Sequence, residues 1–135
     1  MNHLAIRNEV RRRVVSAASI AAATDLKIAG QDFDTSGKSF WAEEHLIGGA
    51  ELPMTNQRNR IGGYLIQYDL CCPIGTSLDA VEQKAAVIET SLLGASFVID
   101  GTDCIIRTIK TTRSEGKRYN AALVLLTLEL NKAGS

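Results

Sequence analysis

The stretch that most restricts the fold runs from Phe40 to Pro73, FWAEEHLIGGAELPMTNQRNRIGGYLIQYDLCCP. Its first part, FWAEEHLI, is typical of a strand, with Phe40 and Trp41 on opposite faces. The polar loop that follows contains Pro53 and is long for a connection between paired strands. Ile61 to Cys72 then predicts a second strand, because apolar side chains alternate with the rest. The stretch reads as strand, loop and strand, with no recognisable catalytic constellation.

Two amphipathic helices are expected on either side of this stretch. Residues 3 to about 20 form the first, and Ser77 to about Leu93 form the second. Thr76 and Asp79 have the spacing of a capping box at the start of the second helix, and Gly94 fits its C′ position. The apolar stripes are Ile6, Val10, Val14, Ala17 and Ala21 in the first helix, and Leu78, Val81, Ala85, Ile88 and Leu92 in the second.

The C-terminal third of the sequence predicts strands. Phe97 to Ile99 is a short strand, Asp100-Gly101 is a turn, and Cys104 to Thr111 is a second strand. Tyr119 to Leu130 is apolar on both faces, which suits a central strand covered on both sides or one covered by another subunit. Residues 131–135 are expected to be a disordered tail. A short strand is also possible in the segment LKIAG, before the loop at residues 30–39.

The expected fold class is therefore α+β, with two helices packed on one face of a mostly antiparallel sheet of about four to six strands. The 135 residues fit a single domain, 1–135. No apolar run is long enough to span a membrane, and the N-terminus does not have the pattern of a secretory signal.

Charge is balanced overall but uneven along the chain. Lysine plus arginine total 15, as do aspartate plus glutamate, which argues against a dedicated nucleic-acid binder. The basic and acidic segments of the chain are either solvated surfaces or complementary patches that meet between copies of the chain. The basic segments hold Arg7, Arg11, Arg12 and Arg13, then Arg107, Lys110, Arg113, Lys117 and Arg118, and the acidic segment holds Asp32, Asp34, Glu43, Glu44 and Glu51.

The sequence offers few candidates for catalytic, metal-binding or cofactor-binding residues. Glu43 and His45 point the same way on their strand and suggest half of a metal site, but the sequence offers no evident third ligand. The three cysteines lack a zinc spacing or a basic activator, so they are expected to be reduced and buried. The glycines form no phosphate-binding motif, and Gly62-Gly63 fits a β-bulge or a close backbone approach at the start of a strand. We therefore expect no catalytic residue, no cofactor and no metal.

Two features of the central stretch are candidates for contact with a partner. Arg58 and Arg60 lie in the polar loop and either remain solvated or pair with carboxylates of a partner. Trp41 either packs in the core or anchors an interface. The candidate interface residues are Trp41, Glu43, Glu44, Arg58, Arg60, Arg113, Lys117 and Arg118.

The order and spacing of these segments resemble those of the tail terminator (tail completion) proteins of long-tailed bacteriophages. The resemblance covers nearly the whole chain. It starts with the N-terminal helix, Trp41-Ala42-Glu43 and the loop LPMTNQRNR. It continues through Gly63, Tyr64 and Tyr68-Asp69-Leu70 to Pro73-x-Gly75, the second helix and the final hairpin. Here Gly63 directly precedes Tyr64, without the spacer of the family pattern.

The resemblance implies a non-enzymatic virion protein. Members of the family form a hexameric ring that caps the tail tube, stops its polymerisation and faces the head connector. The implied partners are other copies of the chain, the tail tube protein and the head–tail connector protein, with no membrane and no specific nucleic-acid binding, although DNA can pass through the ring. The implied location is the head-proximal end of the tail, and the host cytoplasm during assembly. The alternatives are a head-completion or connector protein and, from a different class, a small cytoplasmic ligand-binding domain or enzyme.

Overall fold

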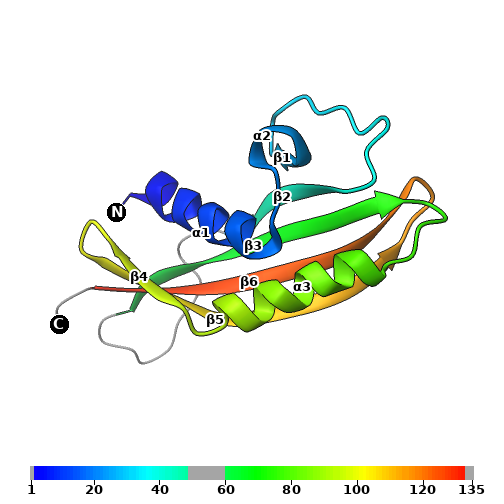
Figure 1. Ribbon diagram of the computed structural model, residues 1–135. Coiled ribbons are helices and arrows are strands. Elements are labelled where there is room, and N and C mark those ends of the chain that lie inside the picture. Colours follow the sequence, from blue (N-terminus) through cyan, green and yellow to red (C-terminus); the bar gives the residue numbers. More distant parts are fainter. Residues whose placement is uncertain (1, 49–59, 133–135) are drawn as a thin grey trace.

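The described part of the protein has an α+β fold with a six-stranded sheet and three helices (Figure 1). The computed structural model describes residues 2–48 and 60–132. The elements follow one another as α1 (His3–Ala18), α2 (Ala22–Asp25), β1 (Leu26–Ile28), β2 (Trp41–Gly48), β3 (Arg60–Pro73), α3 (Asp79–Leu92), β4 (Ser96–Ile99), β5 (Thr102–Glu115) and β6 (Tyr119–Lys132).

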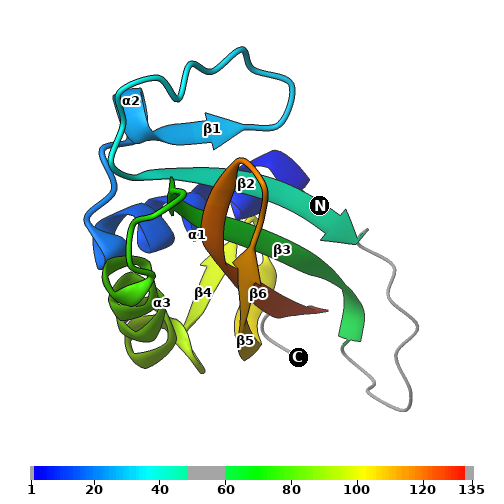
Figure 2. The same ribbon diagram turned by 90° about the vertical axis from the view of Figure 1, so that its right-hand side faces the viewer.

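The sheet is mixed, with strand order β1-β2-β3-β6-β5-β4. β1 runs parallel to β2, whereas every other neighbouring pair is antiparallel. The parallel pair is possible because residues 29–40 form a long connection that returns the chain to the same end. β3, β5 and β6 are each 14 residues long and extend along the molecule (Figure 1), and the turned view shows how strongly the sheet twists (Figure 2).

Alternation along β3 and β6 separates the two faces of the sheet. Tyr68 of β3 lies opposite Val124 of β6 on what we call the core face, and Gln67 lies opposite Leu125 on what we call the outer face. β3 and β6 occupy the two central positions of the sheet, so their side chains set the character of both faces.

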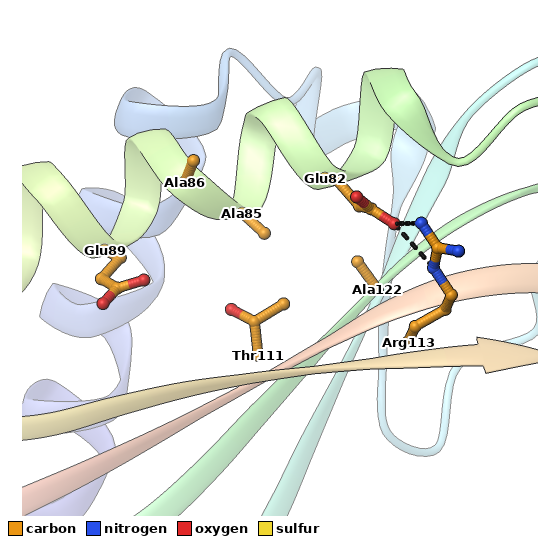
Figure 3. Close-up of a pocket in the computed structure, with 7 residues that line it drawn as sticks. All are labelled: Glu82, Ala85, Ala86, Glu89, Thr111, Arg113 and Ala122. Carbon is orange, nitrogen blue, oxygen red and sulfur yellow. Dashed lines mark hydrogen bonds and ion pairs between the residues drawn. The ribbon is translucent and has the colours of Figure 1, made fainter.

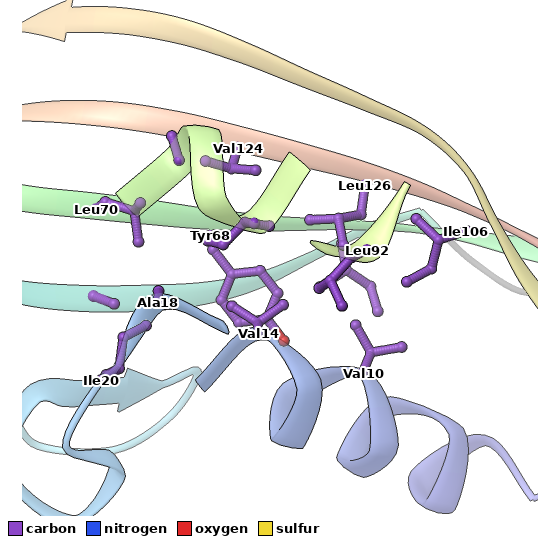
Figure 4. Close-up of a cluster of buried hydrophobic side chains, with 14 of the residues drawn as sticks. Val10, Val14, Ala18, Ile20, Tyr68, Leu70, Leu92, Ile106, Val124 and Leu126 are labelled. Carbon is purple, nitrogen blue, oxygen red and sulfur yellow. The ribbon is translucent and has the colours of Figure 1, made fainter. Parts of the chain in front are cut away.

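The core face carries the hydrophobic core of the protein. The buried residues Val10 and Val14 of α1 pack in the same cluster as Val81 and Ile88 of α3. The cluster also contains the core-face residues of the central strands, among them Tyr68, whose ring projects from the sheet towards α1 (Figure 4). The sequence-predicted stripe of α1 is confirmed at Ile6, Val10 and Val14. Ala18 completes it in place of Ala17, and Ala21 lies beyond the helix end.

The predicted capping box of α3 is wrong. The helix begins at Asp79 with Leu78 as its N-cap, and Asp79 N donates to Ser77 Oγ over 3.1 Å. The side chain of Ser77 therefore accepts the hydrogen bond at the start of α3 that was expected to go to Thr76. The end of the helix was predicted correctly, because Gly94 follows it with a φ of 80° that favours glycine.

Several boundaries differ from the sequence-based expectation. β5 continues to Glu115, four residues past the predicted end at Thr111, because cross-strand pairing with β6 extends through this polar segment. β6 extends to Lys132, so residues 131 and 132 of the predicted disordered tail are in a strand. The short helix α2 was not predicted. The polar loop lies outside the described residues up to position 59, which includes Arg58.

The predicted Asp100-Gly101 turn and the Gly62-Gly63 irregularity are both confirmed. Asp100 and Gly101 join β4 to β5 with φ values of 47° and 75°. The register between β3 and β6 shifts between Arg60 and Gly62. The three cysteines are free and buried, as expected.

Candidate functional site

The outer face of the sheet lies opposite the face that carries the main hydrophobic core. Leu65 and Leu125 lie on it, half-buried, and belong to neither of the two hydrophobic clusters. Leu123 is half-buried beside the smaller cluster of Trp41, Cys71 and Ala121. The middle of the outer face therefore carries apolar side chains with partial access to solvent, whereas the solvated face of an antiparallel sheet is usually polar.

A cluster of ionisable side chains adjoins these leucines. Glu43 and His45 of β2 meet Asp69 of β3, because Glu43 lies directly opposite Asp69 in the antiparallel register. The Nε2 atom of His45 is 3.1 Å from Oδ2 of Asp69 and 3.8 Å from Oε1 of Glu43. One ligand atom from each of the three residues lies within 4.8 Å of the others. We call Glu43, His45 and Asp69 the outer-face cluster.

Two neighbouring side chains orient the carboxylates of the outer-face cluster. The indole Nε1 of Trp41 donates to Oε2 of Glu43 over 3.2 Å. The amide Nε2 of Gln67 donates to Oδ1 of Asp69 over 2.7 Å. Each carboxylate thus has one oxygen held by a neutral donor and its other oxygen turned towards the imidazole of His45.

The sequence-based statement that Glu43 and His45 lack a third ligand is wrong. Asp69 is 24 residues away from His45 in sequence, and only the register of β2 against β3 brings it next to them. The pattern Q-Y-D in β3 does place Gln67 and Asp69 on one face, but no local signal shows which strand lies beside that face.

Cys71 lies next to this cluster on the outer face but does not act as a thiolate. Burial, and to a lesser extent the charges of Glu43 and Asp69, raise the pKa of its thiol far above the ordinary value. Its Sγ donates instead to the backbone oxygen of Asp69. The thiol is therefore neutral and behaves as a small buried apolar group.

The structure places the predicted interface residues of β2 in different environments. Trp41 is 4% exposed and packs edge-on against Tyr119, with a ring-centroid distance of 5.6 Å. Glu44 faces the core side, where it accepts hydrogen bonds from Arg11 and Tyr68. Glu43 is half-buried and reaches the outer face.

The predicted interface residues of the β5–β6 hairpin are all exposed. Arg113 pairs with Glu82 of α3, and its Nε donates to Oε1 of Glu82 over 2.8 Å. This ion pair closes one end of a groove of about 350 Å³ between α3 and the sheet (Figure 3). Within the described part of the chain, Lys117 and Arg118 at the hairpin tip make no ion pair. Arg60 opens β3, and its side chain is not described.

Ion pairs within the chain neutralise many of the charges in the predicted basic and acidic segments. Arg11 pairs with Glu44, Arg12 and Arg13 pair with Glu9, and Arg107 pairs with Glu129. The basic stretches therefore leave fewer charges for a partner than their sequence suggests. Lys117 and Arg118 are the clearest cations that remain exposed at the hairpin tip.

Comparison with known proteins finds a similar fold but indicates no activity. No family model and no curated protein matches the chain. One solved structure, which bears a sequence identifier in place of a functional name, is similar over 100% of this chain and 99% of its own, with 16% identity and a TM-score of 0.68. At this identity the likeness concerns the fold alone. None of the helices in the described residues combines the length and apolar character needed to cross a membrane.

Proposed function

We propose that this protein is a structural assembly protein that forms a closed ring of identical subunits and caps a phage tail tube, in the manner of a tail terminator. The observation that carries the proposal is the outer face of the sheet, where Leu65 and Leu125 remain half-buried on the two central strands. Burying apolar surface in a subunit contact is favourable by about 25 cal/mol for each Å² removed from water. The sequence resemblance supplies the assembly in which this contact would serve.

In this proposal, α1 and α3 together cover the core face of the sheet and leave the outer face to a neighbouring subunit. The buried stripes of both helices belong to the main core cluster, which supports this arrangement. The two-sided apolar pattern of β6 then has a simple reason: Val124 and Leu126 fill the core of the subunit, and Leu125 contributes to the contact between subunits.

The hairpin tip supplies the charged part of the proposed contacts. Lys117 and Arg118 are exposed, and guanidinium and ammonium groups at the rim of an interface favour an acidic partner surface. A contact between different surfaces of the same chain closes into a ring when the rotation between neighbours completes a circle. The hexamer of the family is the expected stoichiometry.

The mass of the protein in solution tests the proposal. We expect native mass spectrometry and light scattering at micromolar concentration and moderate salt to give a closed oligomer, and negative-stain electron microscopy to show a ring with six-fold symmetry. Leu125→Glu places a charge in the middle of the outer face and should give a monomer with an unchanged circular dichroism spectrum. Val87→Glu is the matched control, because Val87 is 45% exposed on α3.

Two results would contradict the proposal. A strictly monomeric wild-type protein would exclude a ring that forms by itself. An oligomer that persists in Leu125→Glu but is lost in Val87→Glu would place the contact on the helix side of the molecule instead of the outer face.

A further inference from the structure

We propose that the outer-face cluster of Glu43, His45 and Asp69 is a binding site for a first-row divalent transition ion such as Zn²⁺. The inference does not require the proposed ring, because all three residues belong to one chain and to one pair of adjacent strands, β2 and β3.

The electrostatics of the cluster favour a divalent cation. Glu43 and Asp69 are directly opposite each other on paired strands, and their side chains are 14% and 13% exposed. Like charges in this position destabilise a strand pair. Among the residues whose side chains are described, His45 is the one basic group within 4 Å of either carboxylate, and no lysine or arginine pairs with them. Metal binding requires a deprotonated imidazole, and in that form the two carboxylates leave a charge of −2, which one divalent ion neutralises.

The geometry of the cluster is close to that of a three-ligand metal site. With bonds of about 2.0–2.1 Å, the ligand atoms around a tetrahedral Zn²⁺ are about 3.3 Å apart. The distances of 3.1 Å and 3.8 Å from His45 Nε2 to Asp69 Oδ2 and Glu43 Oε1 bracket this value. All three ligand atoms lie within 4.8 Å of one another, so the proposal requires the side chains to rotate towards a shared ion.

The residues around the cluster resemble the outer shell of a metal site. Metal-binding carboxylates are usually held in place by further hydrogen bonds. Trp41 and Gln67 do this here, and each binds the carboxylate oxygen that does not face His45. The oxygens Oε1 of Glu43 and Oδ2 of Asp69 are the ones directed at the shared position.

The donor set indicates which ion the cluster would bind. One imidazole nitrogen with two carboxylate oxygens suits Zn²⁺ and its neighbours, whereas Ca²⁺ and Mg²⁺ prefer ligands made of oxygen alone. His45 is 38% exposed at its side chain, so the remaining coordination position is open to water. Three protein ligands with a fourth position open to water are typical of catalytic zinc sites, whereas structural sites have four protein ligands.

The chain contains two histidines, which provide a matched pair of variants. His45→Gln removes the nitrogen ligand, whereas His3→Gln removes the other histidine, which is exposed in α1. Asp69→Asn and Glu43→Gln each remove one charge with little change of shape. Protein without a histidine tag, stripped with EDTA, is titrated with ZnCl₂ by isothermal calorimetry. Circular dichroism of each variant shows that it is folded.

We expect one Zn²⁺ per chain for the wild-type protein and for His3→Gln, and at least a 10-fold weaker affinity for His45→Gln and Asp69→Asn. At a Zn²⁺ concentration 100-fold above Kd, the unfolding equilibrium constant of the wild-type protein should fall by about 100-fold. Co²⁺ should give visible absorption bands that His45→Gln lacks. No binding by the wild-type protein would overturn the proposal and leave His45 as an internal counter-charge of the carboxylates. Equal binding by His45→Gln would place the ion elsewhere.

Discussion

Replacing Glu44 with alanine should be among the most damaging single changes to this protein. Glu44 is 7% exposed on the core face of β2. Its carboxylate accepts hydrogen bonds from Arg11 Nε over 2.9 Å, from Arg11 Nη2 over 2.7 Å and from Tyr68 Oη over 2.6 Å. These bonds tie α1 to two strands of the sheet. Burial raises the pKa of Tyr68 well above its ordinary value, and the charge of Glu44 adds to this, so the phenol stays a donor.

The expected loss in the free energy of unfolding depends on the buried groups that Glu44→Ala leaves without a partner. Removing one partner of a buried ion pair costs about 3–5 kcal/mol. The side chain of Arg11 is 23% exposed and can reach water, so the lower end of this range, about 3 kcal/mol, is expected for Glu44→Ala. For a chain of this size 1 kcal/mol corresponds to about 4 °C, so Tm should fall by about 12 °C. Tyr68→Phe removes a single hydrogen bond to a charged group and should cost about 1.5 kcal/mol.

Urea unfolding followed by circular dichroism measures these changes. The double variant Glu44→Ala/Tyr68→Phe should cost less than the sum of the two single variants, because they share one contact. Glu89→Gln is the control, since Glu89 is exposed on α3 and its change should cost less than about 0.5 kcal/mol. A cost below about 1 kcal/mol for Glu44→Ala, or simple additivity in the double variant, would refute the reasoning.

Two further predictions concern the hairpin and the cysteines. Gly116→Ala should cost about 1–3 kcal/mol in a thermal melt, because a Cβ at this position would lie 2.8 Å from the backbone oxygen of Tyr119. Lys117→Ala, its neighbour, should have almost no effect, and equal stabilities would contradict the steric argument. Burial raises the pKa of Cys104 from 9.0 to about 11. The unfolded thiol therefore ionises first, so the contribution of Cys104 to the free energy of unfolding should be constant well below pH 9 and fall as the pH rises from 9 to 11 under reducing conditions. Cys104→Ala should show a shallower fall, and the same slope in both proteins would exclude this cause.

Elements that depend on local periodicity could be predicted from the sequence. Apolar residues at spacings of three and four indicated α1 and α3, and the alternation in β3 and the two-sided apolar pattern of β6 indicated two strands. The glycine signals at Gly94 and Gly101 were also reliable, because a positive φ excludes most other residues. These features are recorded within a few neighbouring residues, so no tertiary information is needed to find them.

The candidate site could be predicted only in part, because it depends on register. Glu43 and His45 share a face by their spacing alone, but Asp69 joins them through the pairing of β2 with β3. The same limit applies to charges. Glu44 was an interface candidate from its sequence context, yet Arg11, 33 residues earlier, reaches it across the core side of the sheet. A residue's neighbours in sequence show which face it occupies but not which element covers that face.

The two proposals concern adjacent parts of one face, which links them energetically. Asp69 lies opposite Leu123 and Gln67 lies opposite Leu125, so a subunit that covers these leucines also covers the outer-face cluster. Covering two carboxylates removes them from water, which is costly unless a cation compensates their charge. Bound Zn²⁺ should therefore favour the ring, and ring closure should tighten Zn²⁺ binding by the same factor, because coupling between two binding events is reciprocal. At a protein concentration low enough for the ring to be partly dissociated, the mean oligomer mass of the wild-type protein should thus be higher in Zn²⁺ than in EDTA, whereas that of His45→Gln should not change. A wild-type mass that is the same in both conditions would separate the two sites and place the subunit contact away from the cluster.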